Sequence, residues 1–279
     1  MVGLIFAAGL GTRLKPLTDT MPKALVPLAG KTLLQWQVER LRDAGIRDII
    51  VNVHHFPDMI IDTIRANDAW GCNIMISDER DELLDTGGGL KKAVTCYGLQ
   101  VTEEPILACN VDILSNIDIR ALVDEYTRGT RESMNRGLLV VSERETQRYL
   151  CFDEAGCLCG WTNVKTGEVR PENFKFQISY PKGTIISNFK LLAFSGMQIL
   201  SPGVLRLLEQ MPQKKFSLID FYISLCDKRV SLKAYVPEGY KMMDVGKIEQ
   251  INDAERFANM LFNIKSEKND KKFGYIKKK

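Results

Sequence analysis

The sequence has few histidines and no long apolar run, and each shortage argues against a class of protein. Only two histidines, His54 and His55, occur in 279 residues. The seven cysteines are scattered, and the single C-x-C, Cys157 and Cys159, has no second cysteine pair to complete a zinc site. An odd number of cysteines, mostly inside apolar segments, favours a reducing compartment over a disulfide framework.

The chain also has no general excess of positive charge. Its formal net charge is +3, but residues 265–279 hold seven lysines against two acids, so this tail carries +5 and the rest of the chain about −2. Nucleic-acid-binding domains present a basic surface, and we therefore expect no nucleic-acid partner. The basic tail is typical of a solvated, frayed terminus.

We expect neither a membrane-spanning segment nor a signal peptide. No stretch approaches the roughly 20 apolar residues of a membrane span. The first apolar run breaks at Gly9 and has no charged segment before it, unlike a signal peptide. We expect a cytoplasmic protein with no membrane partner. With 45% hydrophobic and 26% charged residues, the chain has the composition of a globular protein with one large core.

Strand-like and helix-like segments alternate along the first half. The pattern predicts buried strands at 2–8, 48–53, 73–77 and 105–112, helices at 32–43, 57–67 and 118–129, and a loop up to Gly89 that leads into "LKKAVTCYG". Such alternation indicates βαβ units. The expected fold class is therefore α/β, a mostly parallel sheet with helices on both faces.

From Gly137 onward the pattern changes to closely spaced strands. They are predicted in "GLLVVSE", "RYLCFDE", "GCLCGWT" and "NFKLLAFSGMQIL", before two helices, two short strands and a final helix from Lys247. No repeat and no Pro/Ser-rich linker separates the halves. We expect one domain over residues 1–264, with a β-rich insertion in its second half, followed by the tail at 265–279.

Glycines and basic residues gather in "LIFAAGLGTRLKPLTDTMPKALVPLAGK", residues 4–31. A dinucleotide-binding fingerprint would need a third glycine where Leu14 stands. The "AGKT" at 29–32 lacks the first glycine of a P-loop, because Leu25 occupies that position and Pro27 interrupts the loop. The remaining candidate is the loop 8–13, which directly follows the first strand.

This loop has residues suited to holding a phosphate group. Its glycines let the backbone turn tightly and bring N–H groups near an anion. Arg13 offers a planar cation that suits phosphate oxygens, and Lys23 follows Pro22 as a second cation. The residues alone leave a second interpretation open, a glycine-rich turn with exposed Lys and Arg side chains.

The segment "LIFAAGLGTRLKPLTDTMPKALVPLAGKTLL" resembles the signature of the sugar-1-phosphate nucleotidyltransferases, also called nucleoside-diphosphate-sugar pyrophosphorylases. The resemblance continues through "DTGGG" (85–89), "CNVD" (109–112), "AFSGMQILSP" (193–202) and "MMDVGK" (242–247), and so covers nearly the whole chain. It implies a Rossmann-like (GT-A-like) fold. It also implies an enzyme that joins a sugar 1-phosphate to a nucleoside triphosphate, releases pyrophosphate and uses Mg²⁺.

The resemblance also implies a role for particular residues. Catalysis falls to Lys23 and Arg13, and the Mg²⁺ ligands are Asp112 and Asp244. The nucleotide-binding residues are Ala8, Gly9, Leu10, Gly11, Thr12, Arg13, Lys23, Thr86, Gly87 and Gly88, and the sugar-phosphate residues are Asn110, Gly160, Ser195 and Gly196. From the residues alone, Asp112 could instead cap a loop and Asp244 a helix.

The chain departs from the family pattern at two points. The usual N-G-D is Asn110-Val111-Asp112 here, and the usual W-x-D-V-G begins with Met242, which replaces an aromatic residue. The D-T-G-G-G segment, and a length that leaves no room for a left-handed β-helix domain, resemble the small uridylyltransferases for N-acetylmuramate 1-phosphate in peptidoglycan recycling. A guanylyltransferase for mannose or heptose 1-phosphate and a cytidylyltransferase for phosphocholine are alternatives.

Two other classes of protein are less favoured by the sequence. A GT-A glycosyltransferase would need a D-x-D, and Asn110 occupies its first position. A non-catalytic sugar-nucleotide sensor would be expected to have lost Lys23 or a metal-binding Asp. His54 and His55 follow a strand, where adjacent side chains point apart, and we expect a local structural role for them. The expected assembly is a monomer or a small homo-oligomer.

Overall fold

The computed structural model describes residues 1–98, 104–129, 136–172, 189–226, 228 and 230–262. The first half comprises β1 (Val2–Phe6), β2 (Pro27–Leu28), β3 (Lys31–Thr32), α1 (Leu33–Asp43), β4 (Asp48–Val53), α2 (Pro57–Ala66), β5 (Asn73–Asp78), α3 (Asp85–Cys96), β6 (Ile106–Asn110), β7 (Ile113–Ser115) and α4 (Ile119–Gly129). The second half comprises β8 (Arg136–Ser142), β9 (Arg148–Phe152), β10 (Leu158–Asn163), β11 (Glu168–Arg170), β12 (Lys190–Leu200), α5 (Pro202–Glu209), α6 (Leu218–Leu225), β13 (Ser231–Tyr235), β14 (Met242–Asp244) and α7 (Ile251–Leu261). The expected boundary at 264/265 and the basic tail lie outside the described residues.

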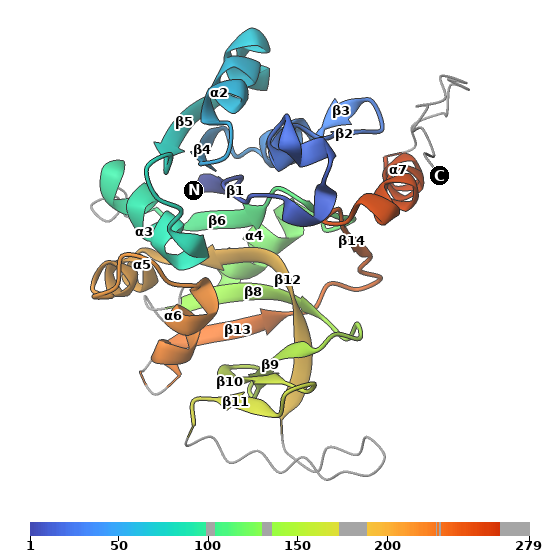
Figure 1. Cartoon of the computed structure of the whole chain (residues 1–279). Coiled ribbons are helices and arrows are strands. Elements are labelled where there is room, and N and C mark those ends of the chain that lie inside the picture. Colours follow the sequence, from blue (N-terminus) through green and yellow to red (C-terminus); the bar gives the residue numbers. More distant parts are fainter. Residues whose placement is uncertain (99–103, 130–135, 173–188, 227, 229, 263–279) are drawn as a thin grey trace.

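A mixed ten-stranded sheet forms the centre of the molecule (Figure 1). Strands β5, β4, β1 and β6 are parallel neighbours, as the βαβ pattern predicts. The C-terminal part of β12 pairs antiparallel with β6, and the N-terminal part of β12 pairs with β9. Strands β10 and β11 follow β9 in the sheet. The second half therefore extends the sheet of the first half. The predicted class, a mostly parallel mixed sheet flanked by helices, is confirmed.

Two apolar cores cover the two faces of this sheet. Side chains from α1, α2, α4 and α7 pack on one face, and side chains from α3, α5 and α6 pack on the other. In Figure 1 the second group lies together at the left of the sheet. Because the central strands are covered on both sides, they read as continuous apolar runs in the sequence.

The segment that imitates a P-loop has a structural role instead. Thr32 is the N-cap of α1, and its side chain accepts a hydrogen bond from the backbone N–H of Gln35 at 3.1 Å. Lys31 forms an ion pair with Glu39 and lies 4.5 Å from the centre of the Trp36 ring. These contacts anchor the start of α1.

The glycine run 85–89 corrects one expectation from the sequence. It was expected to be a loop, but α3 already begins at Asp85. The N–H groups of Gly87 and Gly88 donate to the carbonyl oxygen of Phe216, at 2.9 and 3.1 Å. A neighbouring loop thus satisfies two of the donors that a helix start leaves free, which compensates for the low helix propensity of glycine.

Candidate active site

A cavity of about 320 Å³ opens at the carboxyl ends of the parallel strands. Phe6 of β1, Asn52 of β4, Glu79 after β5 and Asn110 of β6 all reach it. Its full lining is Phe6, Ala8, Gly9, Lys23, Asn52, Glu79, Leu83, Asp85, Thr86, Asn110, Val111, Asp112 and Lys215. This edge is where open α/β sheets bind their ligands.

The loop after β1 is held in a fixed shape beside this cavity. Gly11 has φ +64°, and a Cβ there would lie 2.7 Å from Cγ2 of Thr18, so both conformation and space favour glycine. The Thr18 hydroxyl donates to the carbonyl oxygen of Gly11 at 2.8 Å. His55 Nε2 donates in turn to the carbonyl oxygen of Thr18 at 3.0 Å. Ala8 and Gly9 line the cavity, whereas Leu10 is exposed.

The two predicted cations contact the two predicted carboxylates. Lys23, only 8% exposed, forms an ion pair with Asp112. Arg13 Nη2 lies 3.9 Å from Asp244 Oδ2. A Cβ at Gly246 would lie 2.5 Å from Asp244 Oδ1 and 2.8 Å from the Arg13 guanidinium, so a side chain there would displace one of these two groups.

Backbone pairing brings the two carboxylates side by side. In the β7–β14 ladder Asp244 is opposite Ile113, and the N–H of Val245 donates to the carbonyl oxygen of Asp112 at 2.8 Å. In the part of the chain that the structure describes, neither Asp side chain caps a helix. Burial, and then the charge of Asp112, raise the pKa of Asp244.

This carboxylate pair fits a hard divalent cation. Burial is the first cause of the raised pKa of Asp244 and repulsion from Asp112 the second, and a cation between the two carboxylates would relieve that repulsion. Within the described ranges, no cluster of three or more His, Cys, Asp or Glu side chains is placed to hold a metal. A cation held by Asp112 and Asp244 would therefore complete its shell with phosphate oxygens and water, as Mg²⁺ commonly does.

The predicted base-side residues divide into two groups. Thr86 lines the cavity, and its hydroxyl accepts a hydrogen bond from the N–H of Leu218 at 3.0 Å. Gly87 and Gly88 do not line it. A Cβ at Gly87 would lie 2.5 Å from the Phe216 ring, and one at Gly88 would lie 2.3 Å from the Lys214 carbonyl oxygen. Close packing against the 214–216 segment leaves no room for a side chain at either glycine, and their expected contact with a base stays a prediction.

The predicted sugar-side residues are likewise not all together. Asn110 lines the cavity, and a Cβ at Gly196 would lie 2.8 Å from its side-chain nitrogen. Gly196 has φ +70° at an irregularity in β12, and the buried hydroxyl of Ser195 beside it has no hydrogen-bond partner among the described residues. Gly160 is opposite Cys151 within β10 and does not line the cavity.

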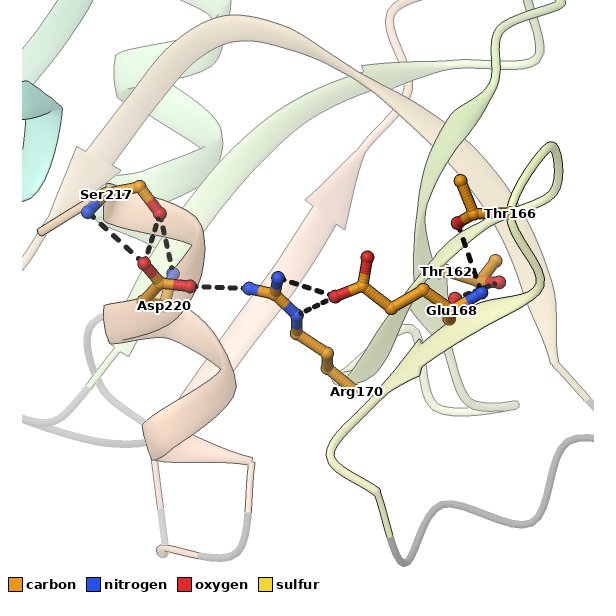
Figure 2. A network of polar contacts seen from close by, with 6 residues as sticks. All are labelled: Thr162, Thr166, Glu168, Arg170, Ser217 and Asp220. Carbon is orange, nitrogen blue, oxygen red and sulfur yellow. Dashed lines mark hydrogen bonds and ion pairs between the residues drawn. The ribbon is translucent and has the colours of Figure 1, made fainter.

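The wall formed by Thr86 is tied to the β9–β11 part of the sheet through α6. Ser217 and Asp220 form a capping box at the start of that helix. Figure 2 shows Arg170 of β11 between Asp220 and Glu168, at 2.7 Å from a carboxylate oxygen of each. The guanidinium also lies 5.0 Å from the centre of the Trp161 ring. Segments 50 residues apart in sequence thus support the same wall.

The nucleotidyl transferase family model matches residues 2–260 of the sequence. The chain belongs to the nucleotidyl transferase family. The match covers the loop after β1, the glycine run and both carboxylates.

The chain is similar to curated members of this family, among them the following two. The N-acetylmuramate alpha-1-phosphate uridylyltransferase of Caulobacter vibrioides is 39% identical over 158 residues, which cover 56% of this chain and 62% of the relative. The mannose-1-phosphate guanyltransferase of Yarrowia lipolytica is 29% identical over 250 residues, which cover 88% of this chain and 61% of the relative. The matched region spans less than two thirds of either relative.

Solved structures of similar fold have lower sequence identity. HddC from Yersinia pseudotuberculosis, complexed with GMP-PN, superposes with a TM-score of 0.66 at 23% identity, covering 92% of this chain and 99% of HddC. A UDP-glucose pyrophosphorylase complexed with UDP-glucose gives 0.68 at 19% identity, covering 93% and 98%. These likenesses confirm the Rossmann-like architecture.

Sequence reasoning did not name several residues of this cavity, among them the buried polar residues Asn52 and Glu79. They are 3% and 1% exposed and hydrogen-bond to each other at 2.8 Å. A signal was available, because each is a polar residue at or just after the carboxyl end of a predicted parallel strand.

In the described part of the chain, no helix is long and apolar enough to cross a bilayer.

Proposed function

We propose that this chain is a Mg²⁺-dependent nucleotidyltransferase that joins a sugar 1-phosphate to a nucleoside triphosphate. A phosphate oxygen of the sugar 1-phosphate attacks the α-phosphorus, the bond to the β-phosphate oxygen breaks, and pyrophosphate leaves. The observation that carries the proposal is the convergence of Lys23, Arg13, Asp112 and Asp244 beside the cavity.

The chemistry explains why cations, and no general base, are needed. The attacking oxygen already carries negative charge, so the site must hold two anions in line and neutralise the charge that develops. In the proposed assignment, the backbone of the loop 8–13 holds the triphosphate and Arg13 neutralises the leaving pyrophosphate. When the substrates bind, Lys23 gives up its ion pair with Asp112 and contacts phosphate oxygens of both reactants instead. Mg²⁺ bound to Asp112 and Asp244 would supply further positive charge to the phosphates.

The proposed substrates are UTP and N-acetylmuramate 1-phosphate, which would place the chain in cytoplasmic peptidoglycan recycling. Support comes from two curated relatives with that activity in their names, at 39% and 40% identity. A guanylyltransferase for mannose 1-phosphate is the second candidate, because the relative with that name aligns with 88% of the chain. Asn110, Ser195 and Gly196 are the proposed sugar side, with Gly160 a more distant member of that side.

A substrate panel tests both candidates. UTP, GTP, CTP and dTTP are each combined with N-acetylmuramate, mannose, heptose or glucose 1-phosphate or phosphocholine, and pyrophosphate release is measured with Mg²⁺ and with EDTA. We expect release from UTP with N-acetylmuramate 1-phosphate, and none in EDTA. Release only from GTP with mannose or heptose 1-phosphate would select the second candidate. No release from any pair would refute the proposed activity.

Lys23→Ala tests the proposed mechanism. If Lys23 acts mainly in the transition state, kcat should fall by ~100-fold or more while the Kd of the triphosphate changes little. Lys15→Ala, which removes an exposed lysine paired with Asp19, is the matched control and should leave kcat unchanged. Equal losses in kcat and in triphosphate affinity would mean that Lys23 only binds.

A further inference from the structure

One pair of side chains connects the two loops that border the cavity. Asn52 Oδ1 accepts hydrogen bonds from the N–H groups of Ala7 and Ala8, at 2.7 and 3.2 Å. Asn52 Nδ2 donates to Glu79 Oε1 at 2.8 Å, and Glu79 Oε2 accepts from the N–H of Leu84 at 3.1 Å. A continuous path of hydrogen bonds thus runs from the end of β1 to the start of α3.

Both side chains are buried, and removing their polar groups from water costs free energy. Burial raises the pKa of Glu79, and its hydrogen bonds to Leu84 and Asn52 oppose that shift. A Cβ at Gly89 would lie 2.7 Å from Glu79 Oε1 and 2.9 Å from Asn52 Nδ2, so the third glycine of the run leaves room for the pair. An apolar pair would avoid the desolvation cost, but it would leave three backbone N–H groups without these acceptors.

We propose that Asn52 and Glu79 are positioning residues of the nucleotide site. Their hydrogen bonds set the distance between the Ala7–Ala8 backbone, which leads into the phosphate loop, and Leu84, two residues before Thr86. A nucleotide that contacts both loops then meets walls at a fixed separation. This inference rests on the proposed function for the nature of the ligand, but the hydrogen-bonded tie itself can be tested without any substrate.

The residue types at the two positions follow from the hydrogen bonds they make. Position 52 must accept from two N–H groups and donate to position 79, so an amide fits and a carboxylate does not. Position 79 accepts twice, so a carboxylate fits. The polarity can be exchanged: in an Asn52→Asp, Glu79→Gln double variant, Asp accepts from Ala7 and Ala8, and the Gln amide donates to Asp while its oxygen accepts from Leu84.

Amide hydrogen exchange of the substrate-free protein tests the tie. The N–H groups of Ala7, Ala8 and Leu84 should be protected in the wild type and in the double variant. Asn52→Asp places two carboxylates together and Glu79→Gln leaves one acceptor short, so exchange at one or more of these positions should accelerate on the order of tenfold in each single variant. Asn67→Asp, at the exposed C-terminal cap of α2, is the matched control and should change none of them.

The Kd of each triphosphate tests the consequence for the ligand site. The single variants should bind the preferred triphosphate on the order of tenfold more weakly and discriminate less between bases, and the double variant should recover both properties. A purely structural role would lower the melting temperature without changing base discrimination. A double variant no better than Asn52→Asp, in exchange and in binding, would overturn the proposal. If the wild type catalyses no transfer but the exchange pattern holds, the proposed function fails and the tie stands.

Discussion

At Asp244, burial and the adjacent carboxylate of Asp112 both act against the charged form and raise the pKa. A carboxyl group whose pKa is raised by folding destabilises the fold when ionised. Stability is therefore lost as the pH rises from the unfolded value, near 3.8, through the raised value. Asp244→Asn should thus raise the melting temperature of the substrate-free protein at pH 7, and this gain should disappear at a pH below 3.8.

The expected gain is below about 1 kcal/mol, because the Asp244 side chain is half-exposed and water screens its charge. Thermal unfolding at several pH values measures it. Asp62→Asn, on the exposed side of α2, is the control and should give no comparable gain. The same Asp244 variant should lose pyrophosphate release and the stabilisation of the wild type by Mg²⁺. A lower melting temperature at pH 7 would contradict the sign of the effect.

At the scale of single elements, the start of α3 depends on a close contact with the 214–216 segment. Gly88→Ala would place a methyl group 2.3 Å from a backbone oxygen of Lys214, so one of the two segments must shift. We expect a loss on the order of 1–3 kcal/mol in the free energy of unfolding, with weaker triphosphate binding. Urea titration and a binding assay measure the two effects.

Gly9→Ala is the matched substitution, because a Cβ at Gly9 would meet no protein atom within 4 Å. Its stability should stay within about 0.5 kcal/mol of the wild type. Its triphosphate affinity should nevertheless fall, since Gly9 lines the cavity and the added methyl group would occupy phosphate space. An unchanged triphosphate affinity of Gly9→Ala would mean that the phosphates bind away from this loop. An unchanged stability of Gly88→Ala would refute the close packing of Gly88 as a requirement of the fold.

The success of sequence reasoning differs between elements for physical reasons. Helix α1 and strand β4 follow local signals, a Thr32 cap and a buried apolar run, and both were predicted within a residue or two. The start of α3 was not predicted, because the acceptor that satisfies its free N–H groups is the carbonyl oxygen of Phe216, which is far away in sequence. The pairing of Asn52 with Glu79 was missed for a similar reason, since it depends on which strands are neighbours.

At the scale of the whole molecule, β12 connects the two halves. It pairs with β6, where Met197 is opposite Cys109, and with β9, where Leu191 is opposite Cys151. The one strand therefore belongs both to the parallel part of the sheet and to the β-rich insertion. We propose that the two parts unfold together as one cooperative unit, although the change in strand pattern at Gly137 could suggest two.

The two buried cysteines report on this cooperativity. Burial raises the pKa of both Cys109 and Cys151 to about 12, so neither thiol should react with an alkylating agent at pH 8 while the protein is folded. In a urea titration with pulsed alkylation, read by mass spectrometry, both should become reactive at the same urea concentration. Cys96 is exposed and provides the internal control, since its access to the reagent does not depend on unfolding. Labelling of Cys151 at a clearly lower urea concentration than Cys109 would contradict this proposal. It would mean that β12 separates from β9 while it remains paired with β6, so that the insertion unfolds first.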